Sequence, residues 1–309
     1  MSRNGKNSCQ EPSIHPGDCF RSTASRSRMR SATYKWMVAK ADTCFSKAQD
    51  VRKTLTTPEK VRRYLESMRR LFLERLGSMP ECGSTPKSRV VSRLKFPTHR
   101  LEKIVFESRP GLLVTANLYL PLDLAVPAPA CLVPAGHIDD GKGYPEYQKV
   151  CMALAKAGFV AMSFDPIGQG ERIQFPDRRR FKSRLIHCVN EHATLSWRSE
   201  LLGFSIGGFM IHDGRRALDY LAGRPEVDSS RLAITGSSGG GTQSSFIGTI
   251  DRRLRAVVPN CYICDRHSLI AQERILFDPE QVQDGLIRDG LDHAELIGMA
   301  APAAVLVQA

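Results

Sequence analysis

One serine in this sequence has the neighbours that a catalytic nucleophile needs. Ser238 lies in the G-x-S-x-G segment 236–240, directly after the strand-like run 232–235 and before a segment with helical character. Flanking glycines let a strand and a helix pass close to a strained turn, where there is little room for a Cβ. A strand, tight turn and helix in this order form a nucleophile elbow. We therefore predict that Ser238 is a nucleophile.

A second G-x-S-x-G segment, residues 203–207, places Ser205 in the same frame, so the motif alone does not choose between the two serines. An elbow requires a strand immediately before it. Residues 194–202 do not form a clear strand pattern, whereas residues 232–235 do. The context therefore favours Ser238.

A serine hydroxyl is a weak nucleophile, so acyl transfer also needs a histidine base and an orienting carboxylate. The sequence indicates these partners less clearly than the serine. The ring of His137 could act as a base, but it precedes the serine, and we interpret it as shaping a loop or contacting substrate. His267 beside Asp265, just past an expected strand, gives an alternative set with Ser238. The other histidines are interpreted as structural, including His293 beside Asp292.

Composition and charge limit the other classes of function. The chain of 309 residues is 42% hydrophobic and 25% charged, which is typical of a globular protein. Its net charge of +12 comes from residues 1–100, which hold 22 Lys and Arg against 8 Asp and Glu, and this region lacks a nucleic-acid recognition pattern. We expect no nucleic-acid partner, no membrane span, no recognised signal peptide and a cytoplasmic location.

The nine cysteines are odd in number and widely spread through the sequence, so a disulfide framework is not indicated. We interpret the lone C-x-x-C at 261–264 as two cysteines that pack at the end of a strand.

The elements that must position Ser238 alternate between strands and helices. A capping pattern at 56–59 and apolar residues at helical spacing predict an N-terminal helix that ends at Gly77. A β-hairpin follows, and then an α/β region, which predicts a doubly wound, mostly parallel sheet with helices on both faces. The expected strands are 103–108, 112–120, 130–134, 159–164, 232–235, 255–259 and 303–308, with helices at about 147–157, 210–221 and after Ser238. Residues 1–50 are expected to be a basic, disordered tail.

With these residues placed, the chain resembles the α/β-hydrolases, and more narrowly their acetyl xylan esterase-like and dienelactone hydrolase-like branch. The resemblance covers about residues 55–309 and depends on four motifs in the same order. They are Gly136-His137 with Gly141-Lys142, Phe164–Arg172, Arg216–Leu221 and Gly236–Thr242.

The resemblance implies ester hydrolysis through an acyl-enzyme on Ser238, with no cofactor and no metal. The oxyanion would be held by the backbone N–H of Gly239 and by a second N–H from His137 or Ile138. Asp165 and Arg172 could line the pocket, although a carboxylate that caps its own loop is the simpler interpretation of Asp165.

The family places its acid and its histidine beyond the strand that here ends at Ala309, so we expect the hydrolase domain, residues 51–309, to lack its C-terminal part. The predicted function is a serine-type carboxylic ester hydrolase that acts on small acyl esters, acetyl groups on carbohydrate among them. The alternative is a catalytically incomplete domain, or pseudoenzyme, with a binding role only. The sequence does not indicate the oligomeric state.

Overall fold

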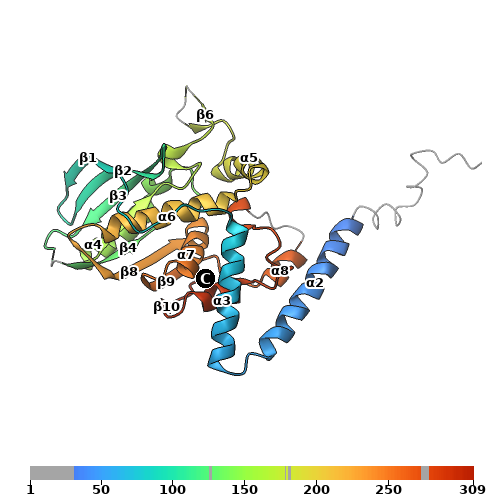
Figure 1. Cartoon of the computed structure of the whole chain (residues 1–309). Helices are drawn as coiled ribbons and strands as arrows, with labels where there is room; N and C mark the ends of the chain where they lie inside the picture. Colours follow the sequence, from blue (N-terminus) through green and yellow to red (C-terminus); the bar gives the residue numbers. More distant parts are fainter. Residues whose placement is uncertain (1–30, 125–126, 178, 180–181, 273–277) are drawn as a thin grey trace, which may run out of the picture.

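The computed structural model describes residues 31–124, 127–177, 179, 182–272 and 278–309. Its strands and helices alternate along most of the chain, as the sequence predicts (Figure 1). The helices are α2 (Ala32–Lys53), α3 (Pro58–Leu76), α4 (Pro145–Lys156), α5 (Cys188–Leu201), α6 (Ile206–Ala222), α7 (Gly239–Ile250), α8 (Arg266–Ala271) and α9 (His293–Met299), with short 3-10 turns η2 (Gly141–Gly143), η3 (Gly170–Arg172) and η4 (Pro279–Gln281). The strands are β1 (Ser88–Lys95), β2 (Arg100–Arg109), β3 (Leu112–Leu120), β4 (Ala128–Leu132), β5 (Val160–Phe164), β6 (Pro176–Asp177), β7 (Lys182–Ser183), β8 (Val227–Ser237), β9 (Leu254–Asn260) and β10 (Ala304–Val305).

The central sheet has the strand order β1-β2-β3-β5-β4-β8-β9-β10. The first three strands are antiparallel to their neighbours, and the five from β5 to β10 run parallel. This arrangement confirms the predicted α/β sheet and its hairpin. In a parallel sheet the loops that follow the strands meet at one edge, so the segments after β4, β5, β8 and β9 lie at the same edge.

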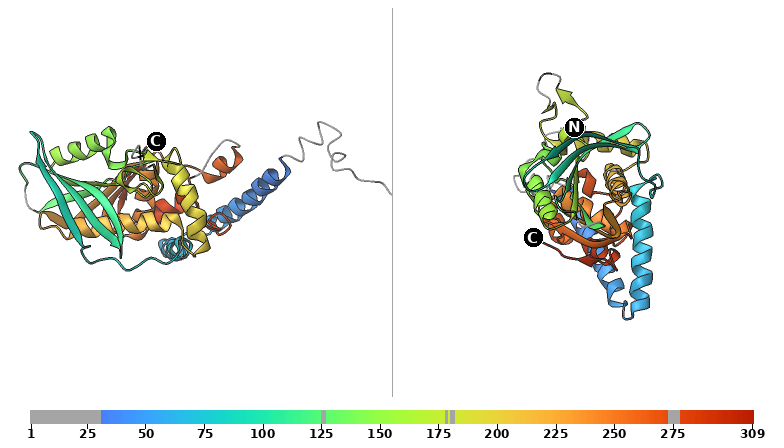
Figure 2. Two further views of the ribbon diagram at one scale, coloured as in Figure 1. Left: turned by 90° about the horizontal axis from the view of Figure 1, so that it is seen from above. Right: turned by 90° about the vertical axis from the view of Figure 1, so that its left-hand side faces the viewer.

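Two apolar layers cover the sheet, one on each face. Along β4 the side chains of Ala130 and Leu132 join the larger core, with helices α3, α6, α7 and α9, whereas Cys131 faces the smaller core under α4. Successive side chains of a strand point to opposite faces, which explains why this short strand is apolar throughout. The two views in Figure 2 show α4 across the sheet from α6.

The N-terminal part contains two helices where the sequence predicts one. Helix α3 is confirmed: the Thr57 side chain caps it by accepting a hydrogen bond from the Lys60 N–H at 3.3 Å, and it ends at Gly77. The prediction of a disordered tail to residue 50 is wrong for residues 32–50, which belong to helix α2; residues 1–30 lie outside the described part. The buried side of α2 is only a narrow stripe of Ala41, Phe45 and Ala48, which gives a weak periodic signal in the sequence.

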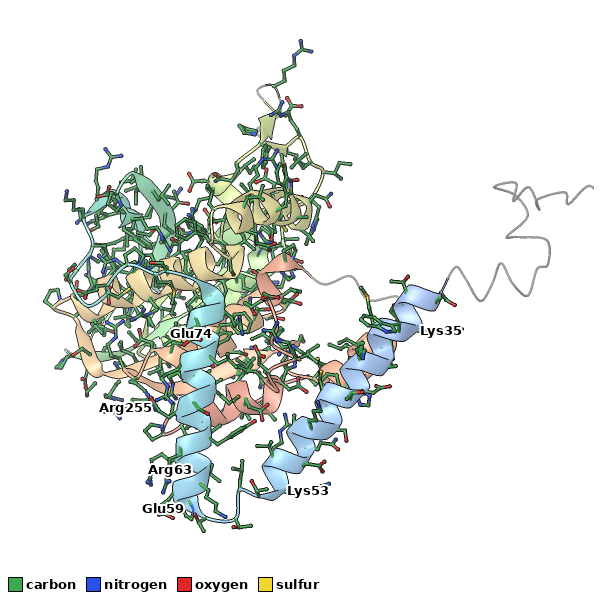
Figure 3. The ribbon with its side chains drawn as sticks, turned by 45° about the vertical axis from the view of Figure 1, so that its right-hand side comes forward. Lys35, Lys53, Glu59, Arg63, Glu74 and Arg255 are labelled. Carbon is green, nitrogen blue, oxygen red and sulfur yellow. The ribbon has the colours of Figure 1, made fainter. Side chains whose placement is uncertain are left out.

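The α2–α3 pair is V-shaped, and α2 diverges from the body of the domain. Figure 3 shows Lys53 at the end of α2 near Glu59 at the start of α3, whereas Lys35 lies far from α3. Arg52 ties α2 to helix α9 through two hydrogen bonds to the buried carboxylate of Glu295, at 2.8 and 2.7 Å. None of the helices in the described ranges is long and apolar enough to cross a membrane.

Candidate active site

Ser238 occupies the turn between β8 and α7, and its backbone is strained there. Its φ of 57° and ψ of −118° lie outside the regions that non-glycine residues ordinarily adopt. A Cβ on Gly236 would lie 2.8 Å from the Pro134 carbonyl oxygen, and one on Gly240 would lie 2.3 Å from the same atom. The elbow geometry predicted from the sequence is therefore present, and the glycines are required because the backbone just after β4, at Pro134, passes beside the turn.

The ring of His137 contacts the serine from the loop that follows β4. Its Nδ1 lies 3.1 Å from Ser238 Oγ. The loop is held in place by Gln169, whose amide donates hydrogen bonds to the carbonyls of Gly136 and Ile138 at 2.5 and 2.8 Å. From the sequence this ring was expected to shape the loop or to contact substrate, but its Nδ1 lies within hydrogen-bond distance of the nucleophile.

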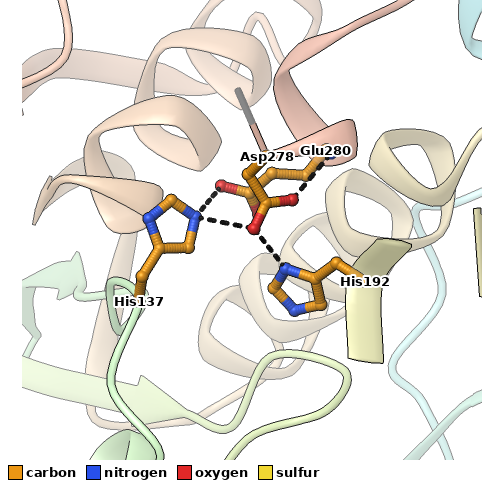
Figure 4. A group of neighbouring side chains, drawn as sticks. All are labelled: His137, His192, Asp278 and Glu280. Carbon is orange, nitrogen blue, oxygen red and sulfur yellow. Dashed lines mark hydrogen bonds and ion pairs between the residues drawn. The ribbon is translucent and has the colours of Figure 1, made fainter. Parts of the chain in front are cut away.

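The other ring nitrogen of His137 contacts a buried carboxylate. Its Nε2 lies 2.8 Å from Glu280 Oε1, and Glu280 is 1% exposed (Figure 4). The turn η4 is fixed by Asp278, whose carboxylate accepts a hydrogen bond from the Glu280 N–H at 2.9 Å. Ser238, His137 and Glu280 thus form a continuous hydrogen-bonded chain.

A second histidine, His192, and a second carboxylate, Asp278, lie beside these three hydrogen-bonded residues. Asp278 Oδ2 is 3.3 Å from His137 Nε2 and 2.6 Å from Nδ1 of His192 (Figure 4). His192 is completely buried, and its Nε2 lies 2.7 Å from the Ile167 carbonyl oxygen. Both ring nitrogens of His192 face acceptors, an environment that suits the doubly protonated ring.

The two carboxylates raise the pKa values of both histidines. Burial alone would lower the pKa of His137, but the hydrogen bond to Glu280 and the charges of Glu280 and Asp278 outweigh it, and the pKa is raised above 6.5. Burial also opposes the charged form of His192, but its hydrogen bond to Asp278 and the nearby charges raise its pKa to about 9. His192 is therefore positively charged at neutral pH, and its charge balances that of Asp278.

This arrangement can perform general-base chemistry. If Nε2 of His137 carries the ring proton and donates a hydrogen bond to Glu280, then Nδ1 carries the lone pair that accepts the proton of Ser238. The remaining oxygen of Glu280 has no hydrogen-bond partner among the residues that the structure describes. Its negative charge is thus available to stabilise the imidazolium that forms when the serine attacks.

The same four side chains are also close enough to hold a metal ion. One ligand atom from each of His137, His192, Asp278 and Glu280 lies within 4.8 Å of the others. Imidazole and carboxylate groups are the ligands of many zinc sites. In the structure each carboxylate accepts a hydrogen bond from a histidine, so protons take the place that a metal ion would occupy. Nδ1 of His137 remains directed at Ser238.

Of the three N–H groups predicted to hold the oxyanion, the structure leaves two, those of Gly239 and His137. Gly239 is the first residue of α7, where an N–H has no partner within the helix. The N–H of Ile138 donates to the Gly136 carbonyl at 2.7 Å and is not free to hold an oxyanion, so the prediction of Ile138 as a donor is wrong. Within the described residues the N–H of His137 makes no hydrogen bond, and it stays a candidate with that of Gly239.

Asp165 and Arg172 were predicted as possible pocket residues; Asp165 is structural, whereas Arg172 both holds a loop and lines a cavity that Ser238 does not line. Asp165 is fully buried and accepts hydrogen bonds from the N–H groups of Lys142 and Glu171, at 2.8 and 3.2 Å, so it caps its own loop and does not line a pocket. Arg172 donates to Asp213 at 2.7 Å and to the Asp165 carbonyl at 3.0 Å. Its guanidinium is thereby committed to holding this loop.

The remaining candidates are held away from Ser238 by other contacts. Ser205 caps α6 by accepting a hydrogen bond from Gly208 N–H at 3.2 Å, and helix α5 stands where an elbow needs a strand. His267 pairs with Asp42 of α2 at 2.7 Å, and Asp265 caps α8, so neither partners the serine. Asp292 caps α9, which confirms its structural interpretation.

Glu280, Asp278 and His192 were not predicted from the sequence to belong to the site. No motif in the sequence marks them, and Asp278-Pro279-Glu280 has the pattern of an ordinary helix start. Only the packing of η4 between α5 and α6 brings these side chains to His137.

The chain is similar in sequence and in fold to known proteins. The chain is 26% identical over 136 residues to YtaP of Bacillus subtilis, which is named as a hydrolase; the match covers 44% of this chain and 40% of that protein. The chain spans less than half the length of the curated relatives it matches.

Solved structures of low sequence identity share the fold. A Bacteroides fragilis protein named as an acetyl xylan esterase superposes with a TM-score of 0.69 at 18% identity, covering 81% of this chain and 68% of that one. A glucuronoyl esterase from Solibacter usitatus gives a TM-score of 0.53 at 17% identity, covering 82% and 74%. The model of the Abhydrolase family matches residues 18–283, so the chain has the α/β-hydrolase fold and belongs to the Abhydrolase family.

Proposed function

We propose that the protein is a serine-type carboxylic ester hydrolase that acts through an acyl-enzyme. One observation carries the proposal: the hydrogen-bonded chain from Ser238 Oγ through His137 to Glu280, with distances of 3.1 and 2.8 Å. A strained serine, a histidine and a buried carboxylate in this order are the parts that nucleophilic acyl transfer requires. The esterase names of structures with the same fold agree with this class of reaction.

In the first half of the reaction, Ser238 Oγ attacks the ester carbonyl carbon and passes its proton to Nδ1 of His137. Glu280 stabilises the resulting imidazolium. The carbonyl oxygen becomes an oxyanion, which the N–H groups of Gly239 and His137 would hold. His137 then gives the proton to the departing alcohol as the carbon–oxygen bond breaks, which leaves the acyl group on Ser238.

In the second half, a water molecule repeats these steps from the other side. His137 takes a proton from the water, the hydroxide oxygen attacks the acyl carbon, and Ser238 leaves with the proton returned by His137. The products are the alcohol and the carboxylic acid. Small acyl groups, acetyl among them, are the substrates that we propose first.

The test is hydrolysis of 4-nitrophenyl acetate by the full chain and by three variants. Ser238→Ala and His137→Gln are expected to lower kcat/KM by at least about 100-fold. Ser205→Ala is the matched control, because it removes the serine of the other G-x-S-x-G segment, and it should keep normal turnover. Turnover that survives in Ser238→Ala would overturn the mechanism, and a folded but inactive wild-type chain would support a binding role only.

A further inference from the structure

A buried arginine near the candidate active site forms no ion pair with any carboxylate of the residues that the structure describes. Arg266, at the start of α8, is 6% exposed. Its guanidinium makes two long contacts, to the Leu291 carbonyl at 3.3 Å and to the Tyr262 hydroxyl at 3.5 Å. A guanidinium has five N–H donors, so most of its hydrogen-bonding capacity is unused.

The other buried arginines show how unusual this is. Arg69, Arg172 and Arg216 are each paired with a carboxylate, of Glu66, Asp213 and Asp219 respectively. Among the described residues, Arg266 is the buried arginine without an ion pair. A buried charge without an ion pair is unfavourable, so the guanidinium of Arg266 is suited to receive a carboxylate from a ligand.

The carboxylates nearest to Arg266 in sequence and space are engaged elsewhere. Asp265 accepts hydrogen bonds from His267 and Ser268 as the cap of α8. Asp292 accepts from the N–H of His293 at 2.7 Å as the cap of α9. Both serve helix ends, and neither forms an ion pair with the guanidinium in the described part of the chain, although the charge of Arg266 acts on the carboxyl group of Asp292.

Arg266 lines a cavity of about 450 Å³, a volume within the range of about 300–1,000 Å³ that small-molecule sites occupy. The walls are mainly apolar and include Leu269, Ile270, Val282, Leu286 and Ile287. The ring of His293 also lines it and is neutral, because burial and the charge of Arg266 lower its pKa to about 3. Arg288, at the same cavity, is already paired with Asp289.

The cavity adjoins the hydrogen-bonded chain of the candidate active site, although Ser238 is not among its lining residues. Gln281 lines the cavity, directly follows Glu280, and donates to the Thr242 hydroxyl in the first turn of α7 at 3.1 Å. Cys261 also lines it and directly follows Asn260, whose carbonyl accepts the Ser238 N–H at 3.0 Å. Two residues that line the cavity are therefore connected to the elbow, Gln281 by a hydrogen bond to α7 and Cys261 as the neighbour of Asn260.

We propose that this cavity binds an apolar carboxylate, with the carboxylate on Arg266 and the apolar body against the lining of α8 and residues 282–287. A planar guanidinium matches a carboxylate through two parallel hydrogen bonds. The proposal extends the proposed function: the cavity is larger than a small acyl group needs, so it takes the alcohol portion of the ester. The substrate class is then a small acyl ester of an aromatic or aliphatic alcohol that carries a free carboxylate.

Binding can be tested without hydrolysis. The probe is 3-(4-hydroxyphenyl)propanoate, measured by titration calorimetry with the Ser238→Ala protein, and its neutral amide is the matched ligand. The carboxylate should bind about 10- to 100-fold more tightly than the amide, and Arg266→Met should remove that difference. Arg255→Gln, at an exposed position on β9, is the control and should leave it unchanged.

Three results would contradict the proposal that Arg266 binds a carboxylate. They are equal binding of acid and amide, carboxylate binding that Arg266→Met leaves intact, and binding of inorganic phosphate as tight as that of the carboxylate. Arg266→Met should also melt no lower than the parent, because it removes an unpaired buried charge. A marked loss of thermal stability would instead show that Arg266 has a structural role and would overturn the proposal, and Arg266→Lys, which keeps the charge, should retain part of the preference for acid if the site binds a carboxylate.

Kinetics separates failure of the site from failure of the proposed function. Wild-type protein should hydrolyse 3-(4-acetoxyphenyl)propanoate with a kcat/KM at least about 10-fold above that of the corresponding propanamide, and Arg266→Met should equalise them. Arg266-dependent binding without hydrolysis of either ester would retain the site and reject the esterase. Hydrolysis of both esters at equal rates, with no selective binding, would retain the esterase and reject the site.

Discussion

The Nδ1 atom of His137 lies 3.1 Å from Oγ of Ser238, although the two residues are 101 positions apart and the histidine comes first. The contact arises because the loop after β4 and the turn after β8 lie at the same edge of the parallel sheet. The carboxylate of Glu280 lies on the other side of the ring. Each of the following predictions depends on a part of this arrangement.

Glu280 should contribute more to turnover than Asp278 does. Glu280→Gln keeps the shape of the side chain but removes the negative charge that orients the ring of His137, and kcat should fall by about 10²–10⁴. Asp278→Asn is the matched change, because Asp278 is farther from His137 Nε2, at 3.3 Å against 2.8 Å. We expect it to cost about 10-fold or less. Equal losses measured in the two variants would assign the orienting role to the pair instead.

The activity should rise with pH as His137 loses its proton. A base acts only in its deprotonated form, and the pKa of His137 is raised above 6.5, so the rising part of the profile should lie above pH 6.5. Glu280→Gln removes the carboxylate that raises this pKa, and the rising part should move to lower pH even though the plateau is lower. A profile of kcat/KM against pH measures both. An unmoved profile would separate the titrating group from Glu280.

Chelators should leave the activity unchanged. The histidines and carboxylates are joined by hydrogen bonds, and a metal bound at Nε2 of His137 would force the proton onto Nδ1 and remove the base. Dialysis against EDTA should therefore retain full turnover, and excess zinc should inhibit it reversibly. A loss of activity on EDTA treatment that zinc restores would contradict this and indicate a metal site.

The ion pair between half-buried Arg52 and buried Glu295 should stabilise the N-terminal helix. Glu295 is also 3.0 Å from the Tyr64 hydroxyl, so Glu295→Gln weakens contacts to both α2 and α3. We expect the free energy of unfolding to fall by about 1–3 kcal/mol. The control is Asp50→Asn, which breaks the exposed pair with Lys53 and should change it by about 0.5 kcal/mol or less. Urea unfolding compares them, and equal effects would contradict the anchoring role.

Local patterns in the sequence were sufficient to predict those parts of the site that lie within one short segment of the chain. The strand, glycine turn and helix around Ser238 occupy one short segment, and each has a residue pattern of its own. The same holds for helix α3, with its cap at Thr57 and its end at Gly77, and for the hairpin of β2 and β3. Alternation of strands and helices was enough to predict the sheet.

The remaining parts depend on tertiary packing, which leaves little trace in sequence spacing. Glu280 lies 143 positions from His137, and His192 lies 86 positions from Asp278. The turn that carries both carboxylates has the pattern of any capped helix start. Helix α2 was missed for a different reason, because only three of its side chains are buried and its remaining surface resembles a solvated segment.

The most direct test of the central claim is covalent labelling with a fluorophosphonate, which reacts with an activated serine. The phosphonylated peptide, mapped by mass spectrometry, should contain Ser238, and His137→Gln should slow labelling by at least about 100-fold while Ser205→Ala leaves its rate unchanged. Labelling of Ser205, or labelling of Ser238 at the same rate without His137, would contradict the account.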